Sequence, residues 1–192
     1  MMKRAVVLAF VAVVPVLAQV SKPSWLDRPL ANWNMPGQAM PRARTSEEDA
    51  RDMTERCTLT VLRNTPGERA VAYAGWVPFH MFDRQIVQRD VEIVGGLAGA
   101  DGMCRPAAFN IFVFVDGRLA GTLSPSEMYS RTDSSIGGAI RLADDDIAAE
   151  FARYADADAL CCPSGRVTVR YRIDRKASPA VVVPVNARVT RP

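Results

Sequence analysis

The sequence predicts an α+β fold, in which a mostly antiparallel sheet of five to seven strands carries one or two short helices and an extended N-terminal arm. Three observations predict this class. Residues 109–123 have a hairpin pattern, residues 165–173 alternate strictly between apolar and polar side chains, and two stretches that open with acidic residues are typical of short helices.

Residues 1–18 have the order of a secretory signal peptide. Lys3 and Arg4 precede an uncharged run over residues 5–18, which ends in Val16-Leu17-Ala18. This run is shorter than the roughly 20 residues that a membrane-spanning helix needs. We therefore expect a cleaved signal, a periplasmic or secreted protein, and no stable membrane insertion after cleavage.

Residues 19–45 are expected to form an extended arm. Their prolines exclude a helix or a central strand, whereas Trp25 and Trp33 are too apolar for a free tail. The indoles are therefore expected to pack on the domain surface, where their exposed parts could recognise a partner. Residues 46–192 are expected to form a single α+β domain.

The first third of this domain is expected to hold one helix and three strands. Thr45 or Ser46, followed by three acidic residues, predicts a helix that ends near Arg56. Strands are expected over residues 57–63, over 70–76 and within 86–94, with a turn at 64–67. Four glycines between positions 95 and 102 predict a flexible loop that leads to Cys104.

The hairpin is the clearest element of the sequence. Residues 109–115 are apolar on both faces, which is typical of a central strand. Asp116-Gly117 is the signature of a type I′ turn, and residues 119–123 return antiparallel.

The C-terminal third is expected to contain one helix and two strands. Three aspartates at 144–146 precede Ile147, Phe151 and Tyr154, whose spacing predicts a helix over 146–156 rather than a calcium loop. Residues 165–173 form a strand whose alternate apolar side chains point inward. Residues 180–185, extended by 188–190, complete the sheet at an edge because Pro184 cannot donate a backbone hydrogen bond.

Four cysteines are expected to form disulfides in an oxidising compartment: Cys57, Cys104, Cys161 and Cys162. A bond between neighbours distorts the peptide between them. We therefore expect Cys161 and Cys162 to pair with Cys57 and Cys104, and a vicinal bond is the alternative. An adjacent cysteine pair with one distant histidine, His80, does not have metal-ligand spacing, so no metal site is expected.

Charge and motifs exclude several classes of function. The chain has 24 basic and 21 acidic residues, and the basic ones are scattered, which argues against nucleic-acid binding. Nucleotide-binding loops and hydrolase motifs are absent from the sequence, and a lone histidine is usually a hydrogen-bonded or surface residue. We expect no cofactor, and an enzyme is not favoured.

Polar residues gather in loops around the central hairpin, and function concentrates on loops that a rigid scaffold holds. The polar cluster comprises Asp101, Arg105, Asn110, Arg118, Ser124, Glu127, Ser130, Arg131 and Asp133. The candidate binding residues of the whole chain are Trp25, Trp33, Arg105, Arg118 and Arg131.

The stretch from Val113 to Thr122 resembles the centre of LppP/LprE-type bacterial envelope proteins. This resemblance implies a location in the cell envelope and carries no catalytic residues. The chain lacks the lipid-attachment cysteine of that family after its apolar run, so membrane anchoring is not implied.

Three functions are consistent with these features. The first is a non-enzymatic protein that binds another envelope component, either a protein or a glycan. The second is a small-ligand carrier, which requires an apolar pocket of roughly 300 Å³ or more between sheet and helix. The third and least favoured is a thiol-redox enzyme that uses Cys161 and Cys162.

Overall fold

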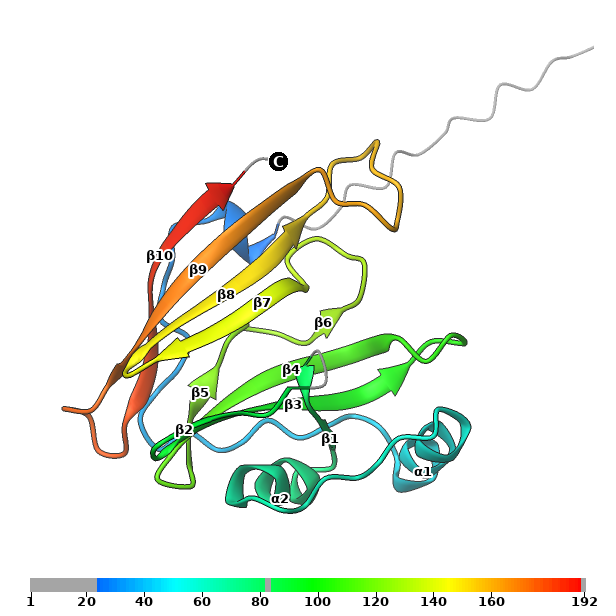
Figure 1. Cartoon of the computed structure of the whole chain (residues 1–192), viewed down its shortest axis with the longest axis horizontal. Coiled ribbons are helices and arrows are strands. Elements are labelled where there is room, and N and C mark those ends of the chain that lie inside the picture. The colour runs from blue at the N-terminus through cyan, green and yellow to red at the C-terminus, as the bar shows by residue number, and fades with distance from the viewer. Residues whose placement is uncertain (1–23, 82–83, 191–192) are drawn as a thin grey trace, which may run out of the picture.

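A computed structural model of the chain describes residues 24–81 and 84–190. Its strands lie in two antiparallel sheets that pack face to face, and helices cover the far side of one sheet (Figure 1). The α+β class, the dominance of strands and the extended arm are confirmed, and the strands divide between two sheets. The signal peptide predicted at 1–18 lies outside the described residues.

The first sheet has six strands: β1 (Val77–Phe79), β2 (Ile86–Gln88), β3 (Val91–Ala100), β4 (Pro106–Val115), β5 (Arg118–Thr122) and β6 (Met128–Tyr129). Its order is β1-β3-β4-β5, with β2 paired to β3 and β6 paired to β4. The second sheet has the order β10-β9-β8-β7 and comprises β7 (Ile136–Ala143), β8 (Asp146–Arg153), β9 (Gly165–Asp174) and β10 (Val181–Thr190).

The helices of the described residues are short: the 3-10 turn η1 (Trp25–Asp27), α1 (Glu47–Arg56) and α2 (Pro66–Tyr73). Ser46 caps α1, and Glu47, Glu48 and Asp49 lie in its first turn, as the sequence predicts. In the described part of the chain, every helix is too short or too polar to cross a membrane.

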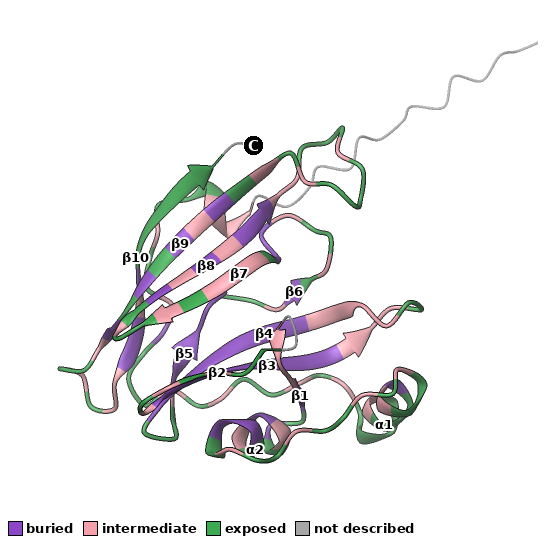
Figure 2. Ribbon diagram, in the orientation of Figure 1, coloured by how far each residue is buried: buried purple, intermediate pink, exposed green. Residues whose placement is uncertain are grey.

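Strand β4 contributes to two hydrophobic cores, because both of its faces are apolar, and its residues from 109 to 115 are all buried (Figure 2). One face packs against the inner side of the second sheet through Phe109, Ile111, Val113 and Val115. The other face presents Phe112 and Phe114 to a smaller core that includes residues of α2. Asp116 and Gly117 have φ angles of 50° and 70°, as a type I′ turn requires. The predicted central strand and hairpin are confirmed.

The predicted helix over 146–156 is wrong, since this segment contains strand β8. Asp144 and Asp145 form the turn between β7 and β8, and Asp144 has a φ of 53°, which aspartate tolerates. Ile147 and Phe151 are four positions apart, a spacing that fits both one turn of a helix and two of the two-residue repeats of a strand. Ala149 between them is also fully buried, so the period is two.

Two predicted strands in the first third are also wrong. Residues 57–63 have no strand structure, and helix α2 covers most of 70–76. Thr65 caps α2 and forms a reciprocal capping box with Glu68, while Pro66 takes the first helical position. The segment at 64–67 therefore starts a helix instead of forming a turn between strands.

Gly95, Gly96 and Gly99 belong to strand β3, so the predicted flexible loop is reduced to the turn at Gly102 that leads to Cys104. A Cβ atom at Gly95 would lie 2.6 Å from the ring of Phe79, and one at Gly96 would lie 2.6 Å from Phe112. Glycine is required here because aromatic rings pack directly against the strand backbone. The predicted strand within 86–94 is confirmed as β2 and the start of β3.

The N-terminal arm joins the edges of the two sheets. The Asn34 side chain is buried, and its Nδ2 donates to the carbonyl oxygens of Thr122 on β5 and Val182 on β10, at 3.0 and 2.9 Å. Its Oδ1 accepts from the Thr122 N–H at 2.9 Å. Trp33 Nε1 donates to the same Thr122 carbonyl at 3.2 Å. The arm is therefore an integral part of the domain.

Arginine–aspartate bridges tie the turns of the two sheets together. Arg175, in the β9–β10 connection, donates from both of its terminal nitrogens to Asp90 and from Nε to Asp145. Asp90 precedes β3 in the first sheet, and Asp145 lies in the β7–β8 turn of the second. The bonds from Arg175 lower the pKa of Asp90 below its usual value. The carboxylate therefore stays charged over the physiological range.

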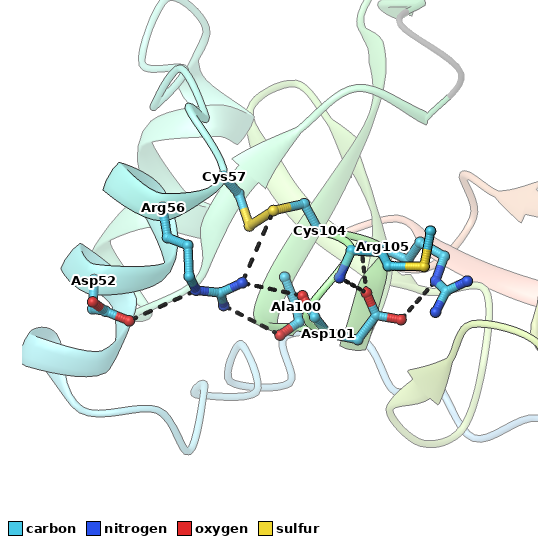
Figure 3. The surroundings of a disulfide bond; sticks show 8 residues. Asp52, Arg56, Cys57, Ala100, Asp101, Cys104 and Arg105 are labelled. Carbon is cyan, nitrogen blue, oxygen red and sulfur yellow. Dashed lines mark hydrogen bonds and ion pairs between the residues drawn. A yellow bond between two sulfur atoms is a disulfide. The ribbon is translucent and has the colours of Figure 1, made fainter.

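The disulfide pairing differs from the expected one (Figure 3). Cys57, directly after α1, pairs with Cys104 in the β3–β4 turn, and their Cα atoms lie 5.4 Å apart. Cys161 pairs with its neighbour Cys162. The fold explains the difference: the first pair lies beside the six-stranded sheet, whereas Cys161 and Cys162 lie in the β8–β9 loop of the other sheet. The β8–β9 loop thus leaves each of them only its neighbour as a partner.

The two disulfides should differ in their contribution to stability. The Cys57–Cys104 bond closes a loop with a sequence separation of 47, so replacing both residues with serine should lower the free energy of unfolding by about 3–4 kcal/mol. The exposed vicinal pair closes no loop, and the same replacement at 161 and 162 should change it by less than about 0.5 kcal/mol. Urea unfolding of both variants tests this, and equal losses would contradict the pairing.

Asn34→Ala should lower the free energy of unfolding by about 2–4 kcal/mol, because it leaves buried backbone groups of Thr122 and Val182 without a partner. The matched control is Asn186→Ala on the exposed part of β10, which should change it by less than about 0.5 kcal/mol. Chemical unfolding at neutral pH measures both. Similar stability of the two variants would show that the arm is not part of the folded unit.

Candidate functional site

A cleft of about 440 Å³ lies between the N-terminal arm and the loop that follows β5. The arm contributes Ser24, Trp25 and Arg28 to its lining. The loop contributes residues between positions 124 and 134, among them Glu127 and Tyr129. The volume lies within the range of small-ligand sites. The two features that the sequence singled out, the tryptophan arm and the polar loop, therefore form opposite walls of one cleft.

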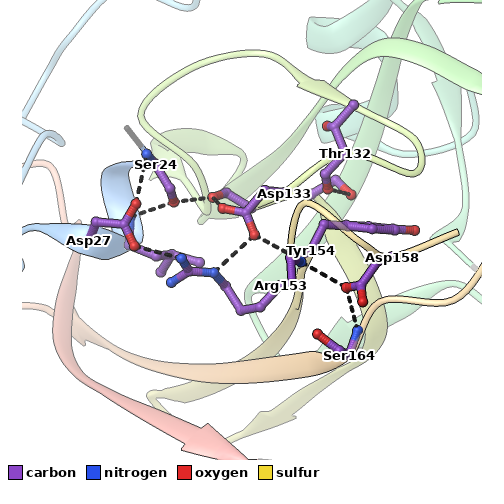
Figure 4. Close-up of polar contacts among 12 residues, drawn as sticks. Ser24, Asp27, Thr132, Asp133, Arg153, Tyr154, Asp158 and Ser164 are labelled. Atoms are coloured by element: carbon purple, nitrogen blue, oxygen red, sulfur yellow. Dashed lines mark hydrogen bonds and ion pairs between the residues drawn. The ribbon is translucent and has the colours of Figure 1, made fainter. Parts of the chain in front are cut away.

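Arg153, at the end of β8, holds the two walls together (Figure 4). Its Nη2 donates to Asp27 Oδ1 of the arm at 2.5 Å, and its Nε donates to Asp133 Oδ1 of the loop at 2.9 Å. Asp133 also accepts from the Tyr154 N–H at 2.9 Å. A hydrogen bond between the hydroxyls of Ser24 and Ser134 joins the walls directly.

The charges of this bridge stabilise one another. The hydrogen bond from Arg153 lowers the pKa of Asp27, against the opposing effect of burial. Burial acts to lower the pKa of Arg153, but the two carboxylates raise it, so the guanidinium stays charged. The bridge is thus an arginine held between two aspartates, one on each wall of the cleft.

Other side chains of the cleft are free to bind. The side chains of Arg28, Glu127 and Tyr129 make no hydrogen bond or ion pair with any residue that the structure describes. Tyr129 is half exposed. Trp25 Nε1 is buried and likewise has no partner among the described residues. The cleft therefore offers a carboxylate, a guanidinium and a phenol that the fold does not use for hydrogen bonding, beside the ring of Trp25.

The two tryptophans of the arm have different positions. Trp25 lines the cleft and packs edge-on against Trp33 and Phe151, with ring centroids 5.2 Å apart in both pairs. Trp33 does not line the cleft: it packs edge-on against Tyr171, with ring centroids 6.2 Å apart, and donates to the Thr122 carbonyl. Trp25 alone thus combines a packing role with a place in the cleft.

The three predicted arginines lie at two ends of strand β4. Arg105 precedes the strand, and Ser130 donates its N–H to the Pro106 carbonyl at 3.1 Å, which brings Arg131 to the same end. Arg118 follows the strand, about 33 Å away at 3.3 Å per residue. Arg118 therefore lines a different hollow, of about 510 Å³, with Arg175 and Pro179.

Arg105 is engaged in the β3–β4 turn (Figure 3). Its Nε donates to Asp101 Oδ2 at 2.6 Å, and Asp101 Oδ1 accepts from the N–H groups of Met103 and Arg105. The backbone N–H of Arg105 is the largest cause of the lowered pKa of Asp101. Arg131, in contrast, is exposed and makes no ion pair with a described residue.

Sequence reasoning missed Arg28, Tyr129 and Arg153. An exposed aromatic residue in an otherwise hydrophilic loop is a signal that could have found Tyr129. The sequence pattern placed Arg153 in a helix. In strand β8, alternate residues share a face, so Arg153 lies on the same side as Phe151 and faces the arm. Nothing in the sequence marks Arg28 among the other arginines.

The fold and the cleft define a three-layer α+β domain with a polar cleft between a loop and an N-terminal arm. A family model described as LppP/LprE lipoprotein matches residues 92–176, a local match that covers less than half of the chain. The match indicates an envelope-associated protein. It runs from β3 to the β9–β10 connection and includes the loop wall of the cleft, while the arm wall lies outside it. No curated protein and no solved structure shows significant similarity to the chain.

The single histidine fixes helix α2 to the first sheet. His80 Nε2 donates to Oε1 of the fully buried Glu68 at 2.9 Å, and the other oxygen of Glu68 accepts from the N–H groups of Asn64 and Thr65. Burial raises the pKa of Glu68, but these hydrogen bonds outweigh it and the net pKa is lowered. Glu92 accepts from the Gly67 N–H at 3.0 Å. The described residues contain no cluster of three or more potential metal ligands.

Glu68→Gln should lower the free energy of unfolding by about 1.5–3 kcal/mol at pH 7, the usual value of hydrogen bonds to a charged group. Because the folded pKa of Glu68 is lowered, its contribution is complete above the ordinary carboxyl pKa and is lost as the pH falls through the folded value. The difference from the unmodified protein should therefore shrink below about pH 4. Urea unfolding between pH 3 and 7 measures it, with the exposed Glu55→Gln as control. A difference that does not depend on pH would contradict a charged Glu68.

Proposed function

We propose that this protein is a non-enzymatic, exported component of the cell envelope that binds a sugar unit of an envelope glycan in the cleft between the arm and the β5–β6 loop. The observation that carries the proposal is the set of unused side chains in this one cleft: Arg28, Glu127, Tyr129 and the Trp25 indole. The family match supports the envelope location.

The chemistry of the lining suits a polyhydroxylated ligand. A sugar presents adjacent hydroxyls that both donate and accept hydrogen bonds, together with apolar C–H faces. A carboxylate such as Glu127 accepts from two hydroxyls, and a guanidinium such as Arg28 donates to two. Tyr129 and Trp25 offer aromatic surface for the C–H face, and the Tyr129 hydroxyl adds a polar atom at the ring edge. Serine and threonine hydroxyls line the remainder of the cleft.

The electrostatics favour binding over hydrolysis. Glycoside hydrolases use a pair of carboxyl groups, one of which must donate a proton. Asp133, the second carboxylate of the cleft, already accepts hydrogen bonds from Arg153 Nε and from the Tyr154 N–H. Glu127 is then the one carboxylate of the lining that is free to act, which is sufficient for a hydrogen bond and insufficient for the two-carboxylate mechanism.

The carrier function receives less support from the interior. A carrier would hold its ligand in an apolar pocket between sheet and helix, but aromatic and aliphatic side chains fill both cores of the described residues.

The thiol-redox function has one favourable feature, the exposure of Cys161 and Cys162 in the β8–β9 loop. Asp158 orders this loop by accepting from the N–H groups of Ala155 and Ser164, so the loop is held in place.

The proposal is tested by titrating the protein with soluble oligosaccharides from envelope glycans, both neutral and N-acetylated, while the tryptophan fluorescence is followed. A ligand in the cleft should change the emission of Trp25. Glu127→Gln and Tyr129→Ala should each weaken binding by about tenfold or more, the effect of losing one good contact. The control variants are Glu55→Gln and Tyr73→Ala, which alter exposed residues of the helices and should leave the affinity unchanged.

Two results would contradict the proposal. One is saturable binding that the cleft variants do not weaken, which would place the ligand elsewhere. The other is that none of the oligosaccharides changes the tryptophan fluorescence, although circular dichroism and the unfolding curve show that the protein is folded.

A further inference from the structure

The second half of β10 is an open edge of the four-stranded sheet. In the order β10-β9-β8-β7, the described residues give strand β10 a neighbour on one side only. Its first half is covered, since Asn34 donates to the Val182 carbonyl and Pro184 adjoins a bulge. From Val185 to Thr190 every residue is exposed (Figure 2). Strand pairing with β9 continues without interruption from Asn186 to Thr190, so this edge has regular strand geometry.

The register of the sheet shows which side chains flank this edge. Ala148, Arg170 and Asn186 are neighbours across three strands on the outer face, and Glu150, Thr168 and Arg188 form the next row. Partners in an antiparallel pair lie on the same face, so both rows point away from the core. Ala148 and Thr168 are small, and a hollow of about 800 Å³ lies over them beside residues 186–190.

The hollow is basic and rich in hydrogen-bond donors. Arg170, Arg188, Asn186 and two threonines line it, and its lining contains no carboxylate. The nearest carboxylate of the outer rows, Glu150, is bound by Arg141 at 3.3 Å. Among the described residues, Arg170 and Arg188 have no ion-pair partner. The hollow therefore carries two uncompensated positive charges beside a free strand edge.

Only an extended polypeptide matches both features at once. The free N–H and C=O groups of an edge strand are satisfied by an added strand, and the two arginines favour acidic side chains on it. A second copy of this chain is disfavoured, because antiparallel pairing of β10 with itself would bring two basic faces together. We propose that the edge from Val185 to Thr190 binds an extended, acidic segment of a partner protein as a fifth strand. The basic hollow beside this edge lies on the outer face of the sheet, whereas the arm packs on the inner face.

The probe is a fluorescent peptide that alternates glutamate with valine, titrated against the purified protein and followed by anisotropy. Two matched peptides carry lysine in place of glutamate, or N-methyl groups on the backbone nitrogens with the charges unchanged. Arg170→Glu/Arg188→Glu removes the positive charge of the hollow, and Arg44→Glu/Arg51→Glu makes the same change in charge at exposed sites outside the second sheet.

The acidic peptide should bind, and its Kd should rise about tenfold or more in the Arg170→Glu/Arg188→Glu variant and not in the control variant. Both the lysine peptide and the N-methylated peptide should lose binding by a similar factor, because charge and strand pairing are both required. Equal affinity for the N-methylated peptide would overturn strand addition.

Two further results would replace the proposed occupant. Binding of anionic phospholipid vesicles that Arg170→Glu/Arg188→Glu abolishes, with no binding of the acidic peptide, would assign the face to a membrane. A dimer in light scattering that is lost on Val189→Glu, with no binding of the peptide, would assign the edge to a second copy. Circular dichroism of each variant distinguishes loss of binding from loss of the fold.

Discussion

The hydrogen bonds of Asn34 are the interaction on which the rest of the structure depends. One buried amide bonds to β5 of the first sheet and to β10 of the second, at 3.0 and 2.9 Å, where the edges of the two sheets meet. Gly121 has a φ of 147° and lies so close to Asn34 that a Cβ atom there would be 2.4 Å from its Cγ. Because Asn34 fixes the arm at this point, Trp33 and Trp25 upstream of it are held against Tyr171 and Phe151. The arm then reaches the polar loop and closes the cleft.

The same organisation explains how far the sequence predicted the fold. Residues whose local signal agrees with the tertiary environment were identified: the Asp116-Gly117 turn, the central strand β4, the alternating strand β9 and the edge position of Pro184. The errors occurred where one spacing fits two periods. Ile147 and Phe151 suit a helix and a strand equally, and only the burial of Ala149 in the assembled core distinguishes them. Thr65-Pro66-Gly67-Glu68 contains both turn residues and a helix-capping box, and the packing of Val71 against β4 favours the helix.

The candidate site was predictable in its parts and not in its assembly. The sequence marked the tryptophan arm and the loop after residue 123, but they are about 100 positions apart, and contacts of Arg153 and Ser134 in the folded chain bring them together. The disulfides show the same limit. Local geometry disfavours a bond between Cys161 and Cys162, whereas the pairing depends on Cys57 and Cys104 lying beside the same end of the first sheet. Long-range proximity of this kind has no local signal.

The cleft and the β10 edge use opposite faces of the second sheet and different chemistry. Hydroxyls, one free carboxylate and aromatic rings form the cleft, whereas free backbone groups and two arginines form the edge. Outer residues of β8 and β9 line the hollow beside the edge, whereas their inner side chains Phe151 and Tyr171 pack against the tryptophans of the arm. The two proposals together assign a glycan to the cleft and an acidic segment of a partner protein to the edge.

Amide hydrogen exchange of the arm tests the central claim of this account most directly. The backbone N–H groups of Leu26, Asn34 and Thr122 all donate to side-chain oxygens of the arm. If the arm is part of the folded unit, these amides should exchange far more slowly than those of an unstructured peptide at neutral pH. Their protection should be lost together with that of β4 when denaturant is added. Exchange of the arm amides at the rate of a free peptide, with β4 still protected, would contradict the account. Neither the junction of the two sheets at Asn34 nor the cleft would then be a fixed feature of the protein.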